Sequence, residues 1–184
     1  MDILLAFTPF LAFAVLEGKL GMPNALLAAT VISALLIARE VLMQKKSLKP
    51  LETVSLLMFG GLALASRLTT LPLSIVGVRL VVDGGLLAVV LGSILMGKPF
   101  TLAYARDRVS VEVAAHARFR TANLMISSLW ALALFLVVAA DAGMLYWPAF
   151  TAMDGTITIV AAIAGAALLT GALPRLFAQK AAHS

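Results

Sequence analysis

The stretch LSIVGVRLVVDGGLLAVVLGSILMGKPF, Leu73 to Phe100, decides how the whole chain folds. Its apolar residues run from Leu73 to Met96, a length that lets a helix cross a bilayer. Two charged residues, Arg79 and Asp83, interrupt the run, and Lys98 with the proline after it closes the run. The stretch predicts a membrane-spanning helix that carries a base and an acid inside it.

The composition extends this interpretation to the full chain. Of the 184 residues, 62% are hydrophobic and only 12% are charged, and the mean hydropathy is +1.05, which is far from a soluble domain. The apolar runs are continuous, whereas barrel strands would alternate apolar and polar residues. We therefore predict an all-α fold, a polytopic membrane helix bundle of five or six transmembrane helices in a single domain, 1–184. The expected helices cover about 3–20, 23–46, 51–66, 73–96, 111–140 and 155–173.

The first segment leaves the number of spans open. Its apolar run, Ile3 to Leu16, is short for a hydrocarbon core roughly 30 Å thick. Pro9 inside the run favours a kink. Segment 3–20 is either a short tilted span or a re-entrant helix, and both alternatives stay open.

The distribution of Lys and Arg predicts the orientation. Six crossings put 11 of the 14 basic residues on one side, in the loops 39–50 and 97–120 and in the C-terminal tail. Cytoplasmic loops hold the excess of Lys and Arg, so both loops and the C-terminus are expected in the cytoplasm. Topology and contact with anionic headgroups then account for the net charge of +5, and no nucleic-acid partner is expected.

Arg79 and Asp83 are the candidate intramembrane polar site. They stand at i and i+4, so they share a helix face and can pair. Asp83 is expected about 15 Å inside the membrane, where ionisable residues usually face a bundle interior or mark a proton or ion pathway. Alternatively, Arg79 extends toward the outer surface and the pair is a neutral structural bridge. The spacing supports both interpretations, and the structural bridge is the preferred one.

Paired and spaced glycines in the predicted spans are candidate helix-packing positions. Small residues let membrane helices approach closely. Glycine pairs could instead loosen a helix and expose its backbone to a solute, as in the broken helices of transporters. Close packing is the preferred interpretation for Gly60, Gly61, Gly84, Gly85 and Gly165.

Three further carboxylates, Glu17, Asp141 and Asp154, fall on the outer side in this topology. They could bind a cation together, but their spacing matches no metal loop, so we interpret them as solvated residues at headgroup level. His116 is a lone histidine in a basic loop. No metal site, cofactor, catalytic residue or nucleophile motif is predicted, and the protein is not expected to be an enzyme.

The second basic loop is a candidate surface for a cytoplasmic partner or for lipid. It places positive charges among aromatic residues, as segments that lie on a membrane surface do. Ser110 is a plausible N-cap of a helix that begins in this loop and continues into the fifth span. The simpler interpretation is a loop that only anchors topology. The charged residues concerned are Lys98, Arg106, Arg108, Arg118 and Arg120.

Four short motifs occur in an order that resembles the bacterial intracellular septation protein A family of small inner-membrane proteins. They are FTPFLAFAVLEG (Phe7 to Gly18), MFGGLAL (Met58 to Leu64), MGKPF (Met96 to Phe100) and the Trp130-Ala131 helix that follows a basic loop. The resemblance implies a bacterial inner-membrane protein with a non-enzymatic role in cell-envelope synthesis and division. It brings no catalytic residues with it.

Two functions of different classes follow. The first is an envelope or septation factor that acts through contacts with membrane lipids and with other inner-membrane envelope or division proteins. The second is a small ion- or proton-coupled transporter or channel, in which Asp83 acts with Arg79 and a second copy of the chain completes a homodimer. Whether a polar cavity reaches Asp83 from either side is the observation that best separates the two functions.

Overall fold

The computed structural model describes residues 5–43, 48–69 and 74–182, and these ranges contain only helices, turns and short connections. The predicted all-α fold is confirmed. The elements in chain order are α2 (Thr8–Leu20), α3 (Met22–Ala38), the π-helical turn η1 (Arg39–Met43), α4 (Pro50–Leu68), α5 (Ile75–Leu95), α6 (Phe100–Ala105), the 3-10 turn η2 (Arg106–Arg108), α7 (Val111–Ala115), α8 (Ala117–Tyr146) and α9 (Ala152–Ala182).

Five helices in the described ranges are long and apolar enough to cross a membrane. Their outward faces carry large apolar side chains such as Leu35, Leu57 and Leu132, each more than half exposed, which suits contact with lipid rather than water. The chain is therefore an integral, multi-pass membrane protein. The helix α2 has 13 residues, about 20 Å of helix, and is shorter than these spans. The spans are Met22–Leu42, Pro50–Leu68, Ile75–Leu95, Ala117–Tyr146 and Ala152–Ala172.

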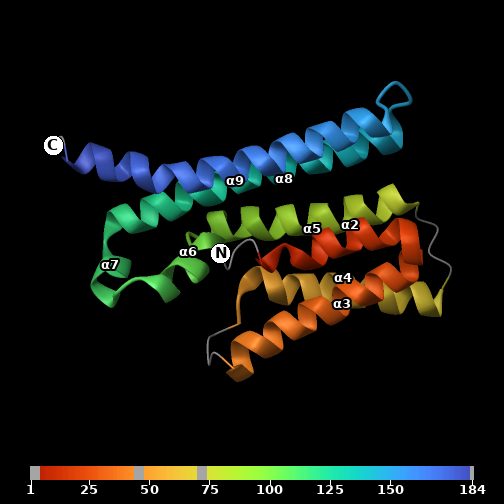
Figure 1. The fold of residues 1–184 in the computed structure, drawn as a ribbon, viewed down its shortest axis with the longest axis horizontal. Coiled ribbons are helices and arrows are strands. Elements are labelled where there is room, and N and C mark those ends of the chain that lie inside the picture. The colour runs from red at the N-terminus through yellow and green to blue at the C-terminus, as the bar shows by residue number, and fades with distance from the viewer. Residues whose placement is uncertain (1–4, 44–47, 70–73, 183–184) are drawn as a thin grey trace.

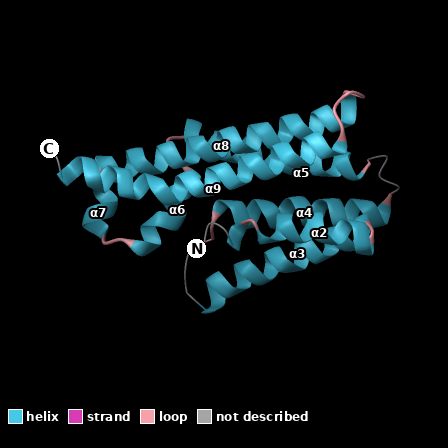
Figure 2. Ribbon diagram, turned by 45° about the horizontal axis from the view of Figure 1, so that its top comes forward, coloured by secondary structure: helices cyan, strands magenta, loops and turns pink. Residues whose placement is uncertain are grey.

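The helix α5 is the centre of the packing. One of its faces contributes Leu86 and Val90 to a core shared with α6, α8 and α9, and another contributes Val78 and Val82 to a core shared with α2, α3 and α4. In Figure 1, α8 and α9 run side by side along one flank, α3 and α4 along the other, and α5 and α2 lie between them. Figure 2 shows the same two groups from a second direction. The predicted span 73–96 thus holds the two halves of the bundle together.

Both ends of α5 are specified by local chemistry. At its start, the Ser74 hydroxyl accepts a hydrogen bond from the Gly77 N–H at 3.1 Å, which is an N-cap. At its end, Gly97 adopts a positive φ of 65°, and the Lys98 N–H donates to the Ser93 carbonyl at 2.9 Å. The MGKPF turn therefore folds back under the bundle and starts α6.

The helix α6 is attached to α8 by buried hydroxyls. The Thr101 hydroxyl donates to the Asn123 carbonyl and lies 2.9 Å from the Ser127 hydroxyl. The Phe100 N–H donates to the Ser93 hydroxyl of α5 at 3.1 Å. These bonds place α6, η2 and α7 at one end of the bundle, opposite the connection between α8 and α9 (Figure 1).

The last two predicted helices differ from the structure: α9 continues nine residues past the predicted end of 155–173, and the fifth, 111–140, is shifted at both ends. Ser110 does cap a helix, since its hydroxyl accepts from the Val113 N–H at 3.5 Å, but that helix is the short α7. His116, in an extended conformation, ends α7 before α8 begins. The expected continuous helix from Ser110 into the span is wrong. At the other end α8 continues to Tyr146, because the segment after Ala140 holds no proline before Pro148.

Candidate functional site

Arg79 and Asp83 lie on the first turns of α5, about 6 Å and 12 Å along the helix from Ile75. They do not form the predicted ion pair with each other. Within the described chain, the Arg79 Nη2 instead lies 3.7 Å from the Asp141 Oδ1 of α8. The Arg79 side chain is 24% exposed, so it reaches across the bundle rather than outward to the surface.

Asp141 is fully buried, with 0% of its surface exposed. The interpretation of this residue as a solvated carboxylate at headgroup level is wrong, because α8 extends past it and turns it toward α5. Neither carboxylate oxygen receives a hydrogen bond of regular geometry from a described residue. Its close neighbours are Arg79 and the Asp83 carboxyl group, which interacts with it directly.

Glu17 of α2 is the third carboxyl group in the cluster. It interacts electrostatically with both Arg79 and Asp141. Its Oε2 is buried and has no hydrogen-bond partner in the described chain. Asp154 lies apart from this group, where its carboxylate accepts hydrogen bonds from Thr151 at the start of α9. The structure therefore brings together three acids and one base from three helices; we call Glu17, Arg79, Asp83 and Asp141 the acidic cluster.

A cavity of about 380 Å³ opens beside the acidic cluster. Among the described residues, Arg79 and Asp83 are the charged ones that line it, and the rest of its wall is apolar apart from Thr8. Its size and its few convergent polar groups are typical of small-molecule sites. Leu11 of α2 lines the cavity and is 68% exposed, so the cavity reaches the outside of the bundle beside α2.

Aromatic side chains form much of the apolar wall. Phe7 stacks on Trp130 of α8, with ring centroids 4.8 Å apart and planes 17° apart. Phe10 meets Phe59 of α4 edge to face at 5.1 Å. The indole N–H of Trp130 donates to the Thr170 hydroxyl of α9 at 3.1 Å, which fixes the ring in the cavity wall.

The predicted packing glycines behave differently from one another. A methyl group added at Gly85 would overlap the Met58 thioether of α4, and one at Gly60 would stand 3.5 Å from the Thr30 methyl of α3. These two positions do bring helices together. At the remaining three an added methyl would meet no described atom within 4 Å, so they carry no close packing in this chain: Gly61, Gly84 and Gly165.

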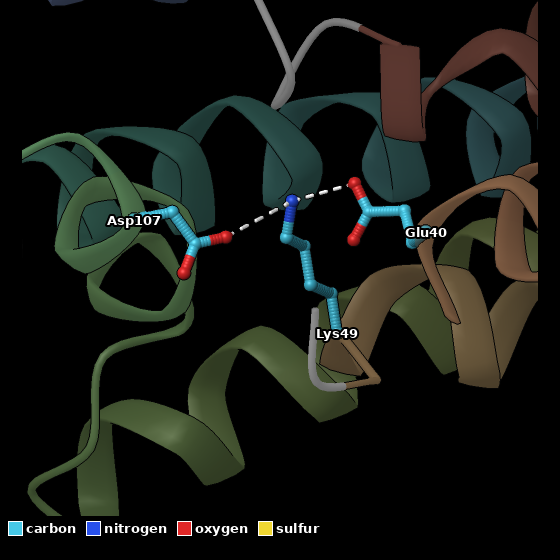
Figure 3. Close-up of polar contacts among 3 residues, drawn as sticks. All are labelled: Glu40, Lys49 and Asp107. Carbon is cyan, nitrogen blue, oxygen red and sulfur yellow. Dashed lines mark hydrogen bonds and ion pairs between the residues drawn. The ribbon is translucent and has the colours of Figure 1, made fainter. Parts of the chain in front are cut away.

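A second polar group, at the other end of the bundle, was not predicted from the sequence (Figure 3). The sequence places Lys49 in a basic loop that sets the topology, yet only 1% of it is exposed. Its Nζ lies 2.7 Å from the Glu40 Oε1, 3.6 Å from the Asp107 Oδ2 and 4.8 Å from the centre of the Tyr104 ring. It thereby connects η1, the start of α4, α6 and η2. We call Glu40, Lys49, Tyr104 and Asp107 the Lys49 cluster.

Burial raises the pKa of Tyr104 well above its ordinary value of 10.0, and the nearby carboxylates of Glu52 and Glu40 raise it further. The phenol therefore stays neutral where an exposed tyrosine ionises. One feature of the sequence points to the Lys49 cluster. Glu40 and Glu52 flank the basic run, but Asp107, the second acid that pairs with Lys49, is distant in sequence.

The predicted basic surface is exposed but not assembled into one pocket. Lys98, Arg106, Arg118 and Arg120 are exposed, and the Arg120 guanidinium donates to the Gly97 carbonyl at 2.8 Å. The Arg108 side chain and residues 44–47 of the first basic loop lie outside the described residues. His116 is exposed, and no group of three metal-ligating side chains occurs in the described chain.

No protein-family model matches this chain, and searches of curated proteins and of solved structures found no significant match.

Proposed function

We propose that this protein is a small proton-coupled membrane transporter whose working site is the acidic cluster. The observation that carries the proposal is that Asp83, inside a spanning helix, lines a cavity of about 380 Å³. Ionisable residues within membrane spans are costly, and they commonly mark substrate and proton pathways. A purely structural ion pair needs no cavity at its side.

The charges of the acidic cluster support coupling to protons. Three carboxyl groups surround one guanidinium, and Arg79 makes its ion pair with Asp141. Ionised carboxylates without positive partners are expensive in a low-dielectric interior. Further positive charge is therefore needed at the cluster, and protons or a cationic solute can supply it in turn. Such alternation is what a proton-coupled exchanger requires.

The envelope or septation role implied by the family resemblance stays a prediction, with lipids and inner-membrane proteins as its partners. The same holds for the bacterial inner membrane, for the homodimer and for the cytoplasmic position of the C-terminus. The positive-inside rule supports that orientation, since the two basic loops and the C-terminus share one side in the charge count.

Charge movement in reconstituted protein tests the proposal without knowledge of the solute. Proteoliposomes adsorbed on a supported membrane are exposed to a rapid pH step, and the transient current is recorded. We expect a current from the wild type and from Asp154→Asn, whose carboxyl group lies outside the cluster, and its loss in Asp83→Asn. Equal currents from all three proteins, or no current above empty liposomes, would contradict the proposal.

A further inference from the structure

The shape of the cavity restricts how a solute can enter it. Leu11 and Ala14 of α2 line the cavity and are exposed on the outside of the bundle, and Ile159 and Ile163 of α9 form part of the same wall. In a bundle of spanning helices, this outside surface faces the hydrocarbon of the bilayer. A solute that enters here must first dissolve in lipid, so most of its surface must be apolar.

The side chains that line the cavity indicate what kind of apolar group the solute carries. Phe10, Phe59 and Trp130 present aromatic groups to the cavity from three different helices. Aromatic faces carry negative electrostatic potential and attract organic cations, with tryptophan the strongest of them. An aromatic-lined cavity is therefore suited to a bulky apolar group that carries or adjoins a positive charge.

The acidic cluster selects the sign of the charge. The guanidinium of Arg79 is engaged by Asp141, whereas Asp83 lines the cavity and has no ion pair with a described residue. A cation beside Asp83 would find a carboxyl group and an excess of acids over bases. An anion at the same place would meet the Asp83 carboxyl group, with two more acids of the cluster behind it, and a guanidinium that is already paired.

We propose that this cavity binds a lipophilic organic cation from the bilayer, with the positive charge beside Asp83 and the apolar body among Phe10, Phe59 and Trp130. This inference rests on the proposed transport function and names its substrate class. Binding adds one positive charge to the cluster, and one proton leaves a cluster carboxyl group for water. The charge of the site is the same before and after the exchange, so cation and proton move in opposite directions.

The two tryptophans of the chain provide a direct reading of occupancy. Trp130 lines the cavity, whereas Trp147 is exposed at the end of α8. In a Trp147→Phe background, Trp130 is the single tryptophan, and a pyridinium cation quenches tryptophan fluorescence on contact. The probe is N-dodecylpyridinium, added to the full-length protein in detergent. Competitors are tetraphenylphosphonium and tetraphenylborate, which have the same shape and opposite charge.

We expect N-dodecylpyridinium to quench Trp130 with saturation, and tetraphenylphosphonium but not tetraphenylborate to reverse the quenching. Asp83→Asn should raise the half-saturating concentration about tenfold or more, because an interior charge partner is lost. Asp83→Glu, which keeps the charge, should restore binding, and Asp154→Asn should leave it unchanged. A wild-type thermal midpoint for Asp83→Asn in detergent shows that its loss of binding is not misfolding.

The outcomes separate this inference from the proposed function. If tetraphenylborate competes as well as tetraphenylphosphonium, or if quenching is absent while the pH-step current persists, the substrate class is wrong and the transporter proposal stands. If quenching is saturable and depends on Asp83 but no pH-step current occurs, the cavity binds cations without proton exchange and the proposed transport function fails.

Discussion

The guanidinium of Arg79 on α5 pairs with the buried carboxylate of Asp141 on α8, with 3.7 Å between Nη2 and Oδ1. The pair joins the central helix to its main neighbour inside the membrane. It also leaves Asp83, one turn from Arg79, facing the cavity. The residue that sequence spacing suggests as the structural partner of Arg79 is thus available for a solute.

Removing one member of this pair should destabilise the bundle more than removing both. Arg79→Leu leaves the Asp141 carboxylate buried without its positive neighbour, which should cost about 3–5 kcal/mol of unfolding free energy. The double variant Arg79→Leu with Asp141→Leu should recover most of that loss. Unfolding in mixed micelles with increasing denaturing detergent measures all four members of the cycle. Strict additivity of the two single changes would show that the pair does not couple α5 to α8.

Lys49→Met should destabilise the end of the bundle that carries the two basic loops. The charge count predicts that this end lies in the cytoplasm. The change removes the buried ammonium group that pairs with Glu40 and Asp107. Breaking a buried ion pair in this way typically costs about 3–5 kcal/mol of unfolding free energy. The exposed Lys98 offers a matched control, and Lys98→Met should have little effect. Hydrogen exchange should accelerate in η1 and α6 in the first variant only. Unchanged exchange in both would rule out the Lys49 cluster as a structural connection.

Two adjacent glycines should respond in opposite ways to alanine. Gly85→Ala places a methyl group against the Met58 thioether, and moving this flexible side chain should cost about 1 kcal/mol. Gly84→Ala meets open space and should stabilise α5 slightly, because alanine favours helix. Thermal midpoints in detergent distinguish them. Met58→Ala should relieve the cost of Gly85→Ala, and its failure to do so would show that the two residues are not in contact.

Tyr104 should resist ionisation in the folded protein. The chain has two tyrosines, and Tyr146→Phe leaves Tyr104 as the single phenol. Because burial raises its pKa above 10.0, tyrosinate absorbance should stay flat to about pH 11 while the protein is folded. The folded state binds its phenolic proton more tightly than the unfolded state does. Stability from this residue is therefore full below about pH 10 and falls as the pH rises further. A normal titration near pH 10 in folded protein would contradict the burial.

The sequence predicted what local chemistry determines. The length of the apolar run, the Ser74 cap and the Gly97 turn determine α5, and the 73–96 helix was placed to within two residues at its start and one at its end. The end of α8 was missed because composition alone put Asp141 with the loop residues. A periodic pattern could have placed it, since Trp130, Leu134, Val137 and Asp141 recur at spacings of four and three and share one buried face.

The partners of charged residues were not predictable in the same way. Arg79 has Asp83 one turn away, yet the packing of α5 on α8 decides that Asp141 receives the guanidinium. Lys49 looked like one charge in a basic loop, and only the return of α6 and η2 beneath the bundle supplies Asp107 and Tyr104. Contacts of this kind depend on tertiary packing between segments far apart in the chain.

Infrared difference spectroscopy on reconstituted protein shows directly whether Asp83 exchanges protons within the membrane. Spectra recorded at acidic and alkaline pH are subtracted in the region of the protonated carboxyl stretch. We expect a band that is present in the wild type, retained in Asp154→Asn and missing in Asp83→Asn. Identical difference spectra for the wild type and the Asp83→Asn variant would show that Asp83 takes up and releases no proton, which rules out its proposed role.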